Sequence, residues 1–141
     1  MRVKMSKLNY AAIAVVIGIG LLVSGCKKSE TLEESVNNRW KAVIENDLEK
    51  AYEYFSPGYK EIENLLSYQN RIATAKINMS WKEGTFKSAN CESETLCKAR
   101  VEVHYTYSFP RRSLGTTESR STVIENWMVV NGKWHFVPKK S

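Results

Sequence analysis

The chain has 141 residues, a formal net charge of +6 and a hydrophobic content of 43%, which suits one ordinary domain. Three of its 21 Lys and Arg residues, Arg2, Lys4 and Lys7, lie in the first 25 residues, where there is no acid, so residues 26–141 carry a net charge of only +3. The sequence has no dense basic stripe with interleaved aromatic residues, and we therefore expect no nucleic-acid partner.

The first 25 residues have the order of an export signal. Basic residues come first, an apolar run follows over residues 10–23, and the small residues Ser24 and Gly25 precede Cys26. A helix of 14 residues is about 21 Å long, which is shorter than the hydrocarbon core of roughly 30 Å. The sequence therefore favours a removable signal over a permanent transmembrane helix.

The segment Val23-Ser24-Gly25-Cys26 resembles the lipobox of bacterial lipoproteins. This resemblance implies that residues 1–25 are removed and that Cys26 carries acyl chains, more than one because a single myristoyl chain binds a membrane only marginally. The residue that follows Cys26 is Lys27 and not Asp, which resembles lipoproteins that enteric-type bacteria sort to the outer membrane. We expect a protein of the bacterial cell envelope that faces the periplasm, with residues 26–30 as a polar tether from the membrane.

The two remaining cysteines, Cys91 and Cys97, lie six residues apart and are predicted to form a disulfide in an oxidising compartment. The loop-entropy estimate for so small a ring is about 2 kcal/mol, so the bond tightens a turn and is not the source of the fold. Two sulfurs without a neighbouring His supply too few ligands for zinc, and the spacing is not CxxC. We expect no metal and no cofactor.

Two or three helices are predicted in the first half of residues 31–141. Thr31 and Glu34 form a capping-box pattern, which predicts a helix start. Apolar residues then recur at helical spacing (Leu32, Val36, Trp40, Val43, Ile44, Leu48, Ala51, Tyr52, Phe55). Asn46-Asp47 either continues this helix or ends one helix and caps the next. Ser56-Pro57-Gly58 stops the pattern, and a second stretch over residues 61–75 places Ile62, Leu65, Leu66 and Ile72 on one side.

After residue 75 the apolar period changes to two, which predicts strands. Strands are expected near residues 83–89, 99–109, 119–130 and 133–137, with a five-residue hairpin loop at 92–96 and a turn at Asn131-Gly132. Helices followed by a meander of strands predict an α+β fold, in which the helices pack in a curved, mainly antiparallel sheet of at least four strands. We expect one such domain over residues 31–141.

Residues 38–59, Glu125-Asn126-Trp127 and Asn131-Gly132-Lys133-Trp134 resemble the nuclear transport factor two-like superfamily, which is related to ketosteroid isomerases. This resemblance implies a cone of curved sheet wrapped on helices over residues 31–138. In relatives that are enzymes, the open end of the cone holds an acid or His that shuttles a proton beside donors that stabilise an oxyanion.

The candidates for such chemistry are Glu125, Tyr105 and Tyr107. Glu125 shares strand parity with Trp127 and is expected to point inward, either as an acid or base or as the partner of an Arg or Lys, unless a bulge turns it outward. Tyr105 and Tyr107 lie on the apolar face of their strand and either offer hydroxyls at a pocket rim or fill the core. His104 and His135 are expected at the surface.

The sequence contains no Ser-His-Asp order, phosphate-binding glycine loop or nucleotide fingerprint. We therefore predict a non-catalytic, lipid-anchored envelope domain that binds a small apolar ligand or a protein partner. One alternative is a small-molecule isomerase or hydratase that uses Glu125 as acid or base and Tyr105 or Tyr107 as donor. The other alternative is a structural subunit of an envelope complex, which requires a large exposed apolar patch.

Overall fold

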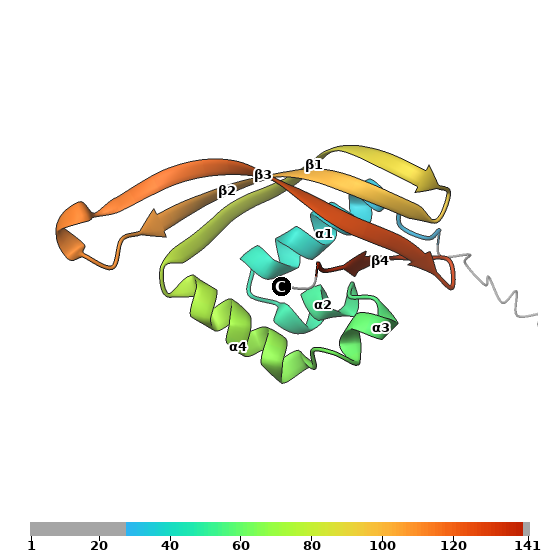
Figure 1. The fold of residues 1–141 in the computed structure, drawn as a ribbon, viewed down its shortest axis with the longest axis horizontal. Coiled ribbons are helices and arrows are strands. Elements are labelled where there is room, and N and C mark those ends of the chain that lie inside the picture. The colour runs from blue at the N-terminus through green and yellow to red at the C-terminus, as the bar shows by residue number, and fades with distance from the viewer. Residues whose placement is uncertain (1–27, 140–141) are drawn as a thin grey trace, which may run out of the picture.

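The computed structural model describes residues 28–139, in which helices come first and strands follow (Figure 1). The helices are α1 (Leu32–Ile44), α2 (Leu48–Glu53), α3 (Pro57–Lys60) and α4 (Leu65–Lys76), and the strands are β1 (Met79–Ser93), β2 (Leu96–Ser108), β3 (Thr116–Val130) and β4 (Lys133–Val137). A short 3-10 helix, Arg112–Leu114, lies between β2 and β3. The predicted signal and Cys26 lie outside the described residues.

The four strands pair in the order β1-β2-β3-β4, and every pair is antiparallel. The sheet is curved, and the N-terminal helices pack against it on its concave side (Figure 1). The predicted α+β fold is confirmed. Within residues 28–139, no helix combines the length and the apolar character needed to cross a membrane.

The helix boundaries follow local capping signals. At the start of α1, Glu34 N donates to Thr31 Oγ1 at 3.2 Å and Thr31 N donates to Glu34 Oε2 at 2.7 Å, so the capping box is present. Asn46 has a φ of 63°, a left-handed conformation that a helix cannot contain, and the Asp47 side chain then caps α2 by accepting from Lys50 N. Asn46-Asp47 therefore ends one helix and begins another.

The segment after α2 differs from the prediction in two ways. Ser56 caps the short helix α3, in which Pro57 occupies the first turn, so these residues start a helix as well as stop one. Helix α4 begins only at Leu65 after the Asn64 cap. The predicted apolar face is partly wrong, because Ile62 and Leu66 are 64% and 66% exposed while the buried line is formed by Tyr68 and Ile72.

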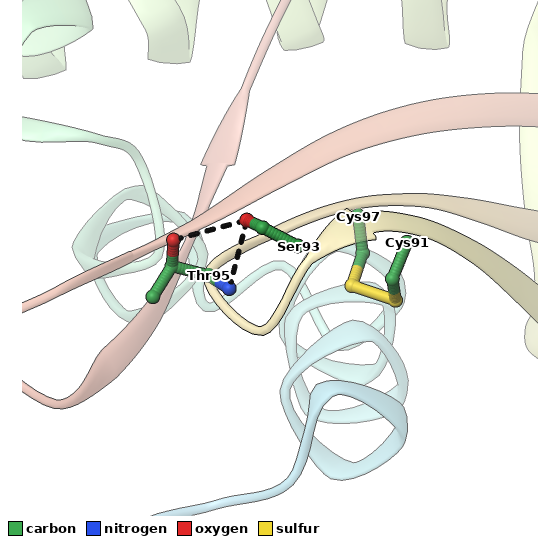
Figure 2. The surroundings of a disulfide bond; sticks show 4 residues. All are labelled: Cys91, Ser93, Thr95 and Cys97. Atoms are coloured by element: carbon green, nitrogen blue, oxygen red, sulfur yellow. Dashed lines mark hydrogen bonds between the residues drawn. A yellow bond between two sulfur atoms is a disulfide. The ribbon is translucent and has the colours of Figure 1, made fainter.

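One of the two hairpin turns is tighter than predicted, and the other is as predicted. Cys91 pairs with Cys97 across β1 and β2 and is joined to it by the predicted disulfide (Figure 2). Because Ser93 pairs with Leu96, the loop has two residues where we expected five. Asn131 and Gly132 have φ values of 51° and 74°, as a two-residue turn between β3 and β4 requires.

Two clusters of buried side chains form the core. One joins α1 to the sheet (Val36, Trp40, Ala99, Val101, Val103, Trp127), and the other joins the helices to one another (Ala42, Val43, Ala51, Phe55, Tyr68, Ile72). Trp81 and Phe136 pack against both clusters. The helices and strands of the described residues and both clusters lie within residues 32–137, so this segment has its own hydrophobic core.

Gly84 allows α1 to approach the sheet closely. It pairs with Val103 in the sheet, and an added Cβ would lie 2.5 Å from the Trp40 ring. We expect Gly84→Ala to lower the free energy of unfolding by about 1–3 kcal/mol, although Ala is otherwise favoured over Gly in a strand. Urea denaturation measures this difference.

Gly58→Ala is the matched control, because nothing lies within 4 Å of its added Cβ. We expect its free energy of unfolding to stay within about 0.5 kcal/mol of the wild type. Equal stabilities of the two variants would contradict the close contact between Gly84 and Trp40.

Candidate functional site

Glu125 lies in the interior and is 5% exposed. Its Oε1 atom accepts hydrogen bonds from Arg39 Nη1 and Trp40 Nε1, both at 3.0 Å, and its Oε2 atom accepts one from Trp127 Nε1 at 3.1 Å. The Arg39 guanidinium also lies over the Phe136 ring, 4.0 Å from its centroid. One carboxylate therefore joins α1 to β3, and its arginine partner reaches β4.

The tyrosines that were considered with Glu125 lie elsewhere on the sheet. Glu125 pairs with Ala99, whereas Tyr105 pairs with Ser119, six positions further along β2. At about 3.3 Å per residue this separation is about 20 Å. Tyr105 and Tyr107 are partly buried. The structure therefore does not bring Glu125, Tyr105 and Tyr107 together in one site.

A half-open groove of about 710 Å³ lies between α1, the α3–α4 segment and the C-terminal part of the chain. Its apolar wall is largely aromatic (Trp40, Tyr59, Tyr68, Ile72, Trp81, Phe136). Four charged side chains also line it (Arg39, Glu63, Arg71, Lys139). An apolar groove of this volume with a few polar groups has the character of a small-molecule site.

Arg71 and Glu63 form an ion pair on the α3–α4 side of the groove. Arg71 Nε donates to Glu63 Oε1 at 2.8 Å, and Arg71 Nη2 donates to Glu63 Oε2 at 2.9 Å. These hydrogen bonds lower the pKa of the Glu63 carboxyl and raise the pKa of Arg71. The pair shows how a carboxylate is bound in this groove, by both nitrogens of one guanidinium edge.

Two buried polar atoms of residues that line the groove have no hydrogen-bond partner within residues 28–139: Arg39 Nε and the Tyr68 hydroxyl. Tyr68 is only 1% exposed. Burial raises the pKa of Tyr68, so its phenol is a neutral donor at physiological pH. Buried polar groups are normally paired, so these two atoms are unusual.

Sequence reasoning did not select Arg39, Tyr68 or Arg71 as site residues. Arg39 carries a signal in the sequence, because it lies three residues after Val36 and thus on the apolar side of α1. A basic residue on an apolar helix face needs a buried partner. Nothing local identifies Tyr68, whose place in the groove depends on how α4 packs.

His104 and His135, which we expected at the surface, are partly buried. His135 Nδ1 lies 3.2 Å from Phe55 O, because a bridge between Phe55 and Phe136 brings the end of α2 next to β4. Burial lowers the pKa of His135. Neither histidine lines the groove. Within residues 28–139, no group of three or more His, Cys, Asp or Glu side chains is arranged to hold a metal ion.

Comparison with solved structures shows the class of fold. A SEC-C motif containing protein from Rhodopseudomonas palustris matches with a TM-score of 0.60 and 11% identity, over 77% of this chain and 76% of that protein. Another SEC-C motif containing protein, from Psychrobacter arcticus, matches with a TM-score of 0.55 and 12% identity, over 79% of this chain and 60% of that protein. No family model matches the sequence, and no curated protein matches it significantly.

The expected resemblance to the nuclear transport factor two-like superfamily is wrong. Two solved structures that share this fold, with TM-scores above 0.5, are SEC-C motif containing proteins. The residues that suggested the superfamily mark an order of helices, turns and strands, and that order is common among α+β domains with an antiparallel meander.

Glu125→Gln tests how much the buried carboxylate contributes to stability. Gln keeps the size of the side chain but removes the charge. It also replaces one acceptor oxygen with an amide nitrogen, which would face donors instead of accepting from them. We expect the free energy of unfolding to fall by about 3 kcal/mol or more, because Arg39 is left buried without its counter-ion. Urea denaturation measures this loss.

Glu118→Gln on the same strand is the control. The Glu118 side chain is 74% exposed and its one ionic contact in the described residues, to His104 Nε2, is 3.8 Å long. We expect a change below about 0.5 kcal/mol. A small effect for both variants would show that the Glu125 cluster does not hold α1 on the sheet.

Proposed function

We propose that this chain is a non-catalytic, lipid-anchored domain of the bacterial cell envelope that binds a small, mainly apolar ligand in the groove between α1 and the α3–α4 segment. The observation that carries this proposal is the groove of about 710 Å³ with its aromatic wall. Small-molecule sites have this size and this mixture of apolar lining with a few polar groups.

Binding is favoured over catalysis by the state of Glu125. A general acid or base needs a proton or a lone pair available to the substrate. Both oxygens of Glu125 already accept hydrogen bonds from Arg39, Trp40 and Trp127. This carboxylate is therefore occupied in holding the fold, and no observation favours the isomerase or hydratase alternative.

The Cys91–Cys97 disulfide supports an exported location, since structural disulfides persist in oxidising compartments. In this proposal Cys26 carries the lipid, and residues 27–31 separate it from the capped start of α1 at Leu32. The tether is short, so the domain stays close to the membrane surface.

The groove is tested with residues 28–141 and the neutral fluorescent probe N-phenyl-1-naphthylamine. Ser67 is exposed on α4 and lines the groove, so Ser67→Phe places a ring in the groove without disturbing the core. We expect this variant to weaken probe binding about tenfold, a loss of about 1.4 kcal/mol, in a fluorescence titration.

Ala73→Phe is the control, because Ala73 is exposed on the same helix but does not line this groove. Its probe affinity should equal that of the wild type. If Ser67→Phe binds the probe as tightly as Ala73→Phe, or if the wild type does not bind it, the groove is not the ligand site.

The anchor is tested by metabolic labelling of the full chain with an alkyne analogue of palmitate. We expect label on the wild type and none on Cys26→Ser, because Cys26 is the proposed site of acylation. The double variant Cys91→Ser/Cys97→Ser should keep its label. Label that persists after Cys26→Ser would overturn the proposed anchor.

A further inference from the structure

We infer that the ligand of the groove carries a carboxylate, which is bound by the free edge of the Arg39 guanidinium and by the Tyr68 hydroxyl. This inference rests on the proposed function, because it names the chemistry of the ligand that the same groove takes. It defines the ligand as an organic acid with an apolar body.

The Arg39 side chain uses only one of its three nitrogens within the described residues. Nη1 donates to Glu125, whereas Nε is buried and has no partner among residues 28–139, and no hydrogen bond of Nη2 is found there. A planar guanidinium presents Nε and Nη2 on one edge, as two parallel donors that match the two oxygens of a carboxylate. Pairing with Glu125 leaves this edge unused.

Arg71 provides a direct comparison in the same groove. It binds the Glu63 carboxylate with Nε and Nη2, at 2.8 Å and 2.9 Å. This is the same edge that Arg39 leaves without a partner. The groove therefore contains one guanidinium edge that already holds a carboxylate and a second, equivalent edge that does not.

Tyr68 supplies a second unused donor. The residue is 1% exposed, and its ring packs edge-on against the Phe55 ring with 4.9 Å between the ring centroids. Its hydroxyl has no hydrogen-bond partner within residues 28–139. The charges of Arg39 and Arg71 both act on this hydroxyl. Arg39 and Tyr68 both line the groove, so a ligand acceptor that reaches both would satisfy two buried donors, and a buried donor left unsatisfied is unfavourable.

The charges of the groove favour an acid over a base. Arg39, Arg71 and Lys139 line it, and both nearby acids, Glu63 and Glu125, are already paired with an arginine. A ligand cation would meet three positive side chains without a free carboxylate. An incoming carboxylate gains charge-assisted hydrogen bonds, while the rings of Trp40, Trp81 and Phe136 cover the apolar part of the ligand.

The test compares an acid with its neutral analogue, naphthalene-2-acetate and naphthalene-2-acetamide, by calorimetric titration of residues 28–141. We expect the wild type to bind the acid at least about tenfold more tightly than the amide, since each hydrogen bond to a charged group contributes about a factor of ten. Tyr68→Phe should lower the affinity for the acid by about tenfold or more and the affinity for the amide by less, because the neutral amide oxygen accepts a weaker hydrogen bond than a carboxylate.

Tyr68→Phe is well suited to this test because its hydroxyl has no protein partner to lose within the described residues. Its melting temperature should be equal to or higher than that of the wild type. In the control Tyr52→Phe, the lost hydroxyl donates to Glu63 O at 2.7 Å and lies outside the groove lining. That variant should melt about 4 °C lower and keep the full preference for the acid.

Each outcome decides between the two proposals. Equal affinities of the wild type for acid and amide would overturn the carboxylate site and leave groove binding in place, whereas failure to bind either compound would overturn both. An acid preference that Tyr68→Phe leaves undiminished would remove Tyr68 from the site. Tenfold tighter binding of 2-naphthyl phosphate than of the acid would show that the groove recognises phosphate.

Discussion

The architecture depends on one buried carboxylate. Glu125 accepts three hydrogen bonds from donors on α1 and β3, and a carboxylate can be buried only when such donors compensate for its lost hydration. The same contacts orient the rings of Trp40 and Trp127, which form much of the core between helix and sheet. Gly84 gives Trp40 the space to reach its acceptor. The position of α1 is therefore specified by hydrogen bonds as well as by apolar packing.

This interaction also determines which chemistry remains for the groove. Because Glu125 takes Nη1 of Arg39, the guanidinium is held over Phe136 with its Nε without a partner in the described residues. A buried ion pair contributes little net stability compared with apolar side chains of the same volume, but it fixes a geometry. Here the geometry places an arginine in the wall of an aromatic groove. Glu125 therefore fixes the position of the Arg39 guanidinium in the groove wall.

The features that the sequence predicts correctly are those with local causes. The capping box at Thr31, the turn at Asn131-Gly132 and the pairing of Cys91 with Cys97 each depend on residues within a few positions of one another. Two of the three partners of Glu125, Arg39 and Trp40, lie 86 and 85 positions away on α1, and no local pattern connects them to it. The buried face predicted for residues 61–75 was partly wrong for a similar reason. Ile62 and Leu66 are as apolar as Ile72, and only tertiary packing determines which of them is buried.

Different kinds of contact hold the two walls of the groove. Phe136 is fixed by backbone hydrogen bonds on both sides, from its own N to Tyr54 O at 2.6 Å and from Ser56 N to its O at 2.9 Å. The opposite wall is closed by the bidentate Arg71–Glu63 pair, in which the Arg71 side chain is 52% exposed and the Glu63 side chain is 13% exposed. The wall at β4 is therefore fixed through the backbone, whereas the wall at the α3–α4 segment is fixed through side chains.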